Sequence, residues 1–91
     1  MTTLVEWHKV DGAQIAKVLR ETSQDLEGRG GEVLLDFSAV QRIDPPGLLA
    51  LEDLADAAEK KSVKVVLRGL NVNVYKVLKV ARLSGRFSFV D

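Results

Sequence analysis

The feature that most constrains this chain is an abrupt change of hydrophobic periodicity within residues 32–58. The first part, Val33–Phe37, is an apolar run interrupted only by Asp36. Because this run is too short for a helix and lacks polar alternation, it predicts a strand buried on both faces. From Pro45 onward the apolar residues recur at helical spacing. The stretch therefore predicts a strand, a loop and a helix, the corner where parallel α/β sheets commonly place their binding sites.

The sequence Asp44-Pro45-Pro46-Gly47 marks the expected start of that helix. Proline is tolerated in the first helical turn, because the backbone N–H groups there lack an intrahelical acceptor. The Asp44 carboxylate can accept hydrogen bonds from these free groups and favours the positive end of the helix dipole. We therefore expect Asp44 to cap a helix that ends near Lys60. Its predicted buried side consists of Leu48, Leu51, Leu54, Ala55 and Ala58.

The segment before this corner predicts one strand and one helix. The strand is expected within Thr2–Lys9, and Asp11 with Gln14 three residues later has the pattern of a capping box. The glycine-rich segment 28–31 is expected to end the helix and turn the chain. The predicted apolar stripe of this helix consists of Ile15, Val18, Leu19, Thr22 and Leu26.

The segment after the corner continues the alternation of strand and helix. Residues 63–67 predict a strand, Asn71 or Asn73 is expected to cap a third helix, and Gly85 is expected to end it. Residues 87–90 alternate like a short final strand. Because helices separate the strands, the strands are expected to pair in parallel. The predicted fold class is α/β: one domain over residues 1–91, β-α-β-α-β-α-(β), with a mostly parallel sheet of about four strands.

Composition excludes several classes of function. The 91 residues contain 46% hydrophobic residues, 13 basic against 13 acidic residues and no cysteine. Balanced charge argues against a dedicated nucleic-acid binder, and the missing cysteines exclude disulfides and thiolate zinc sites. No apolar run is long enough to cross a membrane, and no signal-peptide pattern is present. We therefore expect a cytoplasmic protein without direct membrane insertion.

The ionisable side chains do not form a recognisable catalytic motif. Asp36 and Asp44 are both expected near the carboxyl end of the central strand, where two carboxylates could perform acid–base chemistry or bind magnesium. The simpler interpretation has Asp36 bonded to loop amides and Asp44 capping the helix. The single histidine, His8, has no nucleophile motif to accompany it. We expect no enzyme activity, no metal site and no cofactor.

The third helix and its exit are locally basic. The basic residues are Lys76, Lys79, Arg82 and Arg86. A solvated helix face accounts for them, and an acidic patch on a partner protein is the functional alternative.

The run DFSAVQRIDPPGLLAL, residues 36–51, resembles the core motif of STAS domains, the anti-sigma-factor antagonist family. In that family an apolar strand ends in Asp, a Ser-containing turn follows, and Ile-Asp-Ser-Ser/Thr-Gly-Leu opens a helix. The downstream segments VKVVLRGL and NVNVYKVLKVARLSGRFSFV are similar to the next strand and the last helix of the family. The matching residues in the core motif are Asp36, Ser38, Val40, Ile43, Asp44, Gly47, Leu48 and Leu51.

Two departures from the family pattern affect the expected function. The family has two strands before its first helix, whereas only one is predicted here. A missing strand leaves an unpaired sheet edge, which could support a homodimer. The second departure is Pro46, which stands where the family carries its phosphorylatable Ser or Thr. Proline has no hydroxyl group, so the phosphate that switches off binding in the family cannot form at this position.

The resemblance implies a non-catalytic regulatory domain that binds a protein partner through residues 38–53. The expected partner is a kinase of the anti-sigma-factor type, a transporter subunit or a stress complex, and sequence alone does not choose between them. The expected partner-binding residues are Ser38, Ile43, Asp44, Pro45, Pro46, Gly47, Leu49, Glu52 and Asp53.

Two other functions are alternatives. A receiver-like domain would accept a phosphoryl group on Asp36 at the end of the central strand. Against this alternative, no adjacent acidic pair follows the first strand, and the required Thr/Ser and Lys do not sit at the ends of later strands. Nucleotide binding is a weaker alternative, because no phosphate-binding loop follows a strand.

Overall fold

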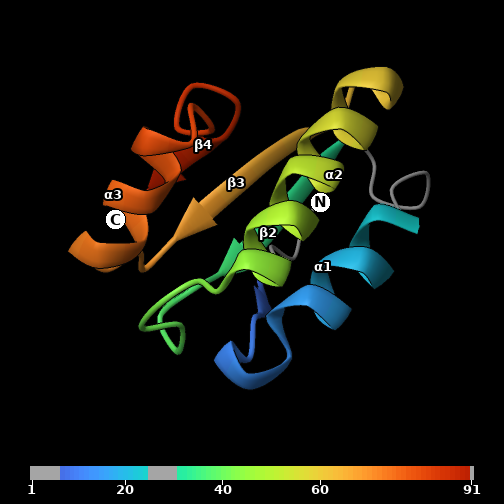
Figure 1. The fold of residues 1–91 in the computed structure, drawn as a ribbon. Coiled ribbons are helices and arrows are strands. Elements are labelled where there is room, and N and C mark those ends of the chain that lie inside the picture. Colours follow the sequence, from blue (N-terminus) through green and yellow to red (C-terminus); the bar gives the residue numbers. More distant parts are fainter. Residues whose placement is uncertain (1–6, 25–30, 91) are drawn as a thin grey trace, which may run out of the picture.

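The computed structural model describes residues 7–24 and 31–90, and Figure 1 shows the path of the chain. The strand predicted within Thr2–Lys9 is present as a short strand at its end, and residues 2–6 lie outside the described part. Leu26 and residues 28–30 of the predicted helix and turn also lie outside it. The elements are β1 (His8–Lys9), a 3₁₀ turn (Gly12–Gln14), α1 (Ile15–Gln24), β2 (Glu32–Asp36), α2 (Pro45–Lys61), β3 (Lys64–Arg68), α3 (Val72–Val80) and β4 (Ser88–Val90).

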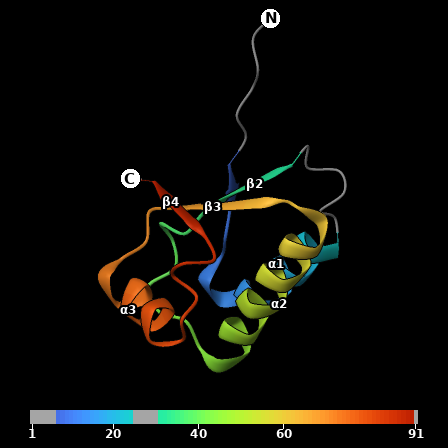
Figure 2. The same ribbon diagram turned by 90° about the horizontal axis from the view of Figure 1, so that it is seen from above.

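The four strands form one sheet in the order β1-β2-β3-β4, and every neighbouring pair is parallel. The predicted fold class is therefore confirmed. Figure 2 shows all three helices on the same face of this sheet, so the described residues form two layers. β1 and β4 are the edge strands, and a homodimer through an edge stays a prediction.

The expectation that the central strand is buried on both faces is wrong. Val33 and Leu35, which face the helices, are 1% and 0% exposed, whereas Leu34 and Asp36 on the other face are half-buried. Leu34 is paired with Val66 of β3, and such cross-strand pairs stabilise a sheet face that none of the helices described here covers.

The core lies between the sheet and the three helices. Because the helical faces carry apolar residues at a period near 3.6, each helix turns one stripe toward the strands. Thr22 is the buried polar residue of α1, and its hydroxyl donates to the Val18 carbonyl over 2.9 Å. The fully buried large side chains are Phe37, Leu19, Leu35, Leu51, Leu54, Leu67, Leu78, Val10, Val33, Val40 and Val74.

Two of the three predicted caps form as expected, and the third opens a different element. Asp44 caps α2 and Asn71 caps α3, with their side chains accepting from the N–H groups of Gly47 and Val74. The side chain of Asp11 instead accepts from the Ala13 N–H and opens the 3₁₀ turn that leads into α1.

The prediction that Gly85 ends the third helix is wrong. α3 ends at Val80, and Arg82 follows in the left-handed conformation with φ 61°. The N–H of Leu83 then bonds to the Leu78 carbonyl, and the Leu83 side chain is buried. This hydrophobic contact fixes the turn without a glycine. A Cβ atom on Gly85 would meet nothing within 4 Å, so the loop there does not require glycine.

Candidate docking surface at the strand–helix corner

Asp36 at the end of β2 holds the loop that leads to α2. Its Oδ1 accepts from the Ser38 N–H at 2.9 Å, and its Oδ2 lies 3.2 Å from the Arg68 guanidinium. The hydrogen bonds from the Ser38 backbone and hydroxyl, followed by the Arg68 contacts, lower the pKa of Asp36. Both oxygens are therefore engaged, which favours the structural role over that of a phosphoacceptor.

The lowered pKa of Asp36 predicts a specific loss of stability in acid. The carboxylate contributes stability above its unfolded pKa of about 3.9, and this contribution is lost as pH falls through the lower folded value. We expect Asp36→Asn to lower the free energy of unfolding by about 1–2 kcal/mol at neutral pH. This difference from the unmodified protein should shrink as pH falls below the unfolded pKa and through the lower folded pKa, as followed by urea unfolding at each pH.

The control for this prediction is Asp53→Asn, which removes an exposed carboxylate from α2. Its effect on the free energy of unfolding should stay within about 0.5 kcal/mol at neutral pH and throughout the acidic range. A constant difference between Asp36→Asn and the unmodified protein across the whole pH range contradicts the proposed linkage.

The turn after β3 packs directly against this loop. Gly69 has φ 71°, and a Cβ atom there would lie 3.0 Å from the backbone nitrogen of Ser38. On the sheet face opposite α1, α2 and α3, the Arg68 guanidinium lies 4.2 Å from the centre of the Trp7 ring, a cation–π contact. The ends of β2 and β3 therefore fix the start of the β2–α2 loop from two sides.

The other end of the loop is fixed by the first turn of α2. Asp44 Oδ1 accepts from the Gly47 N–H at 2.9 Å, and the Leu48 N–H donates to the Asp44 carbonyl. Gly47 is buried, and a Cβ atom there would lie 2.9 Å from both Asp44 Oδ1 and Ile15 Cγ2. Glycine is therefore needed for α2 to approach α1. Gly47 shapes the corner but presents no side chain to a partner.

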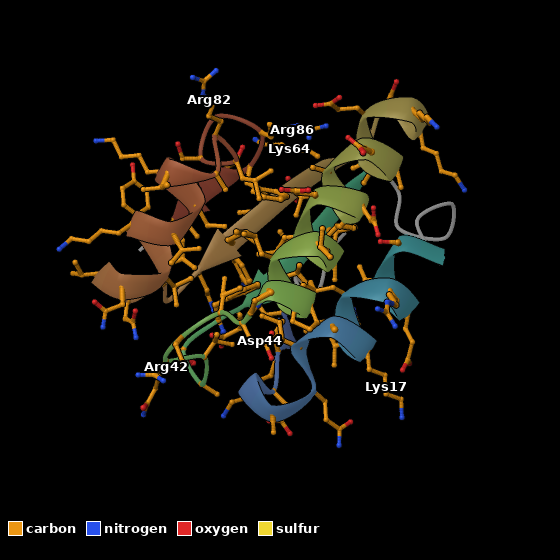
Figure 3. All side chains as sticks on the ribbon, viewed as in Figure 1. Lys17, Arg42, Asp44, Lys64, Arg82 and Arg86 are labelled. Atoms are coloured by element: carbon orange, nitrogen blue, oxygen red, sulfur yellow. The ribbon has the colours of Figure 1, made fainter. Side chains whose placement is uncertain are left out.

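Most of the predicted partner-binding residues lie at the surface of this corner. Figure 3 shows Asp44 at the end of the β2–α2 loop, with Arg42 extending outward nearby. Ile43 and Glu52 are half-buried, and Leu49 is 60% exposed despite being a large apolar residue. The exposed members, which we call the corner surface, are Ser38, Asp44, Pro45, Pro46, Leu49 and Asp53.

A second apolar surface lies beside the corner, and the sequence analysis did not identify it. Leu48 of α2 and Val77, Val80 and Ala81 of α3 line a groove together with Lys76. Val80 is 85% exposed. The available signal was the position of Val80, which lies off the helical stripe formed by Val74, Val77, Leu78 and Ala81 and so is not expected in the core.

One of the basic residues in and after α3, Arg86, forms ion pairs with α2. Arg86 donates to Asp56 over 2.7 Å and to Glu59 over 2.9 Å. These contacts tie the loop after α3 to α2. Arg86 is therefore a structural residue, whereas Lys76, Lys79 and Arg82 are exposed.

The described residues contain no cluster of three or more His, Cys, Asp or Glu side chains that could hold a metal ion. Within the same residues, no helix is both long and apolar enough to cross a membrane.

The family model of the STAS domain matches residues 8–91, which include the whole corner and all four strands. The chain belongs to the STAS domain family. The resemblance seen in the core motif is thereby confirmed. The match extends to β1, upstream of the segments that carry the sequence resemblance.

Individual STAS relatives agree with this assignment. The chain is 40% identical over 53 residues to the intermembrane phospholipid transport system binding protein MlaB of Escherichia coli K12, and equally to that of Shigella flexneri. Each match covers 58% of this chain and 55% of the relative, so the chain matches about half the length of these proteins.

A solved structure shows the same fold. It is a crystal structure described as that of an anti-sigma factor antagonist from Thermotoga maritima, with a TM-score of 0.72 and 16% sequence identity. The alignment covers 97% of this chain and 75% of the other. Together with the family match, this fold supports a regulatory domain of the protein-interaction type.

Proposed function

We propose that this STAS domain is a non-catalytic docking module that binds a protein partner through the corner surface. The observation that carries the proposal is Leu49, a large apolar side chain left 60% exposed beside a rigid helix start. Exposed apolar side chains within a polar surround are typical of protein interfaces. Here the polar surround is supplied by Asp44 and Asp53.

The rigidity of the corner supports docking at low entropic cost. Pro45 and Pro46 occupy the first turn of α2, and Asp44 fixes that turn through its side chain. A surface that is ordered before binding loses less conformational entropy when a partner docks. Gly47 adds to this rigidity because it seats the turn against Ile15 of α1.

We also propose that phosphorylation at the family's usual site does not regulate binding by this domain. Pro46 is exposed at the corner and carries no hydroxyl group. A phosphate at that position would add a charge of about −1.5 to −2, which an apolar partner surface would have to desolvate. Without this switch, the corner surface is available whenever the domain is folded.

Among the partner classes, the match to MlaB favours a subunit of a transport system over a kinase of the anti-sigma-factor type or a stress complex. In this proposal the domain acts in the cytoplasm as an accessory subunit and performs no chemistry itself.

Photocross-linking tests this proposal directly. A photoreactive amino acid is placed at Leu49 in the full chain, and at Lys17 on the exposed side of α1 as the matched control. We expect position 49, and not position 17, to cross-link one specific protein in native lysate. Equal cross-linking from both positions, or cross-linking from position 17 alone, contradicts the proposed surface.

A further inference from the structure

The loop between β2 and α2 separates two parts of the corner surface, Ser38 at its start and the group that begins with Asp44 at its end. Residues 40–43 of this loop belong to neither a helix nor a strand, so no ladder of backbone hydrogen bonds holds them. Near the start of the loop, the Val40 N–H donates to the Phe37 carbonyl at 2.9 Å, and the Val40 side chain is 1% exposed. The rest of the loop needs contacts from other elements if the two parts are to keep their relative position.

Asn71, the cap of α3, supplies such a contact through the second polar atom of its side-chain amide. Its Nδ2 donates to the Gln41 carbonyl at 2.9 Å, while its Oδ1 accepts from the Val74 N–H at 2.9 Å. The two partners fix which atom is nitrogen, because a carbonyl can only accept and an N–H can only donate. Within residues 7–24 and 31–90, no other side chain donates a hydrogen bond to the backbone of residues 39–43. One asparagine thus links the start of α3 to the middle of the β2–α2 loop.

The Asn71 side chain is itself held in place by α3. The Asn71 carbonyl accepts from the Tyr75 N–H at 3.0 Å, in addition to the bond that Oδ1 makes with Val74. Because the backbone and Oδ1 are both tied to the first turn of α3, Nδ2 is presented to the loop with little further loss of side-chain entropy. The 3₁₀ turn also approaches the loop, since a Cβ atom on Gly12 would lie 3.2 Å from the Ala39 carbonyl oxygen. The loop is therefore held by the turn before α1 and by the start of α3.

We propose that Asn71 is a positioning residue of the corner surface. Through the Gln41 carbonyl it sets the conformation of the β2–α2 loop, and thereby the placement of Ser38 relative to Asp44. This role rests on the proposed function, because it concerns the surface that docks the partner. Without the Asn71–Gln41 bond the loop has more conformations, which a partner must restrict on binding, so the affinity falls. The net contribution of one hydrogen bond corresponds to a change in affinity of about 3- to 10-fold.

Asn71→Asp separates the two contacts of this side chain. An aspartate caps a helix as well as an asparagine does, but its second oxygen cannot donate to the Gln41 carbonyl. Asn71→Ser is the uncharged counterpart, because its single hydroxyl oxygen is used by the cap. Asn73→Asp is the matched control, since it makes the same chemical change and adds the same charge at an exposed position in the first turn of α3.

Backbone amide relaxation, measured by NMR on the purified chain, reports the order of the loop without any partner. Order parameters for residues 39–43 should fall from about 0.85 toward about 0.6 in both Asn71 variants and stay unchanged in Asn73→Asp. The Val74 amide should keep its protection from hydrogen exchange in all three variants, because the cap of α3 persists. Loop order parameters that stay near 0.85 in both Asn71 variants overturn the proposal. Loss of Val74 protection together with loop order also overturns it, because the effect then belongs to the cap.

Titration with the partner that cross-links at position 49 tests the consequence for docking. Both Asn71 variants should bind this partner about 3- to 10-fold more weakly, whereas Asn73→Asp should bind within about 2-fold of the unmodified protein. Unchanged affinity despite a loosened loop overturns the positioning role. If no protein cross-links at Leu49, the proposed function fails, and the order parameters of the loop still decide whether Asn71 positions it.

Discussion

Leu49→Asp is expected to weaken binding of the cross-linked partner by at least about 30-fold, which corresponds to about 2 kcal/mol. The substitution places a charge where an apolar side chain meets the partner, and burying an unpaired charge at an interface is costly. The position is 60% exposed, so the free energy of unfolding should change by no more than about 0.5 kcal/mol. Calorimetric titration of the purified pair measures the affinity, and urea unfolding measures the stability.

Lys17→Asp is the matched control, because it introduces the same side chain at an exposed position of α1. It should leave the affinity unchanged within about 3-fold, since a charge far from an interface acts weakly at physiological salt. If Leu49→Asp binds the partner as tightly as the unmodified protein, Leu49 is not part of the interface.

Phe37→Ala should produce the largest loss of stability among the substitutions considered. Phe37 is 0% exposed and its N–H donates to the Arg68 carbonyl, so the side chain is anchored in the core where β2 ends. Removing a buried phenylalanine costs about 3–5 kcal/mol through lost burial and the remaining cavity. For a chain of 91 residues the total is about 5–14 kcal/mol, so a large part of it would be lost.

Urea unfolding followed by circular dichroism measures this loss. Leu49→Ala serves as the control, because it removes a large apolar side chain from an exposed position of α2. It should change the free energy of unfolding by less than about 0.5 kcal/mol. A loss below about 1 kcal/mol for Phe37→Ala would show that this side chain is not part of the tightly packed core.

The elements around the corner were predictable from sequence because their signals are local. The Asp44 side chain caps α2 by accepting a hydrogen bond from the N–H three residues later, and Asn71 caps α3 at the same spacing. The strands were predicted within one residue at β2 and β3, since apolar runs of that length have few alternatives in a small α/β domain.

The features that sequence reasoning missed depend on residues far apart in the chain. The pairing of Asp36 with Arg68 joins positions 32 residues apart, and that of Arg86 with Asp56 joins positions 30 apart. No local pattern indicates such contacts. The one-sided arrangement of helices was missed for a similar reason, because an apolar residue such as Leu34 can be covered by neighbouring strands as well as by helices.

The predicted binding residues were placed by the family resemblance, and the structure divides them by their accessibility. Gly47 supplies close packing, whereas Pro46 and Leu49 present surface. The groove beside Val80 required the structure, because Leu48 of α2 and Val77, Val80 and Ala81 of α3 are far apart in the sequence.

The central claim is that the hydroxyl-free corner at Pro46 is a permanently available docking surface. The most direct test compares the affinity of the partner for the unmodified protein, Pro46→Ser and Pro46→Asp. An aspartate in the first turn of α2 is favoured by the helix dipole, so this variant is expected to stay folded. We expect Pro46→Ser to bind within about 3-fold of the unmodified protein and Pro46→Asp to bind at least about 10-fold more weakly. Binding of Pro46→Asp at the affinity of the unmodified protein would contradict the claim.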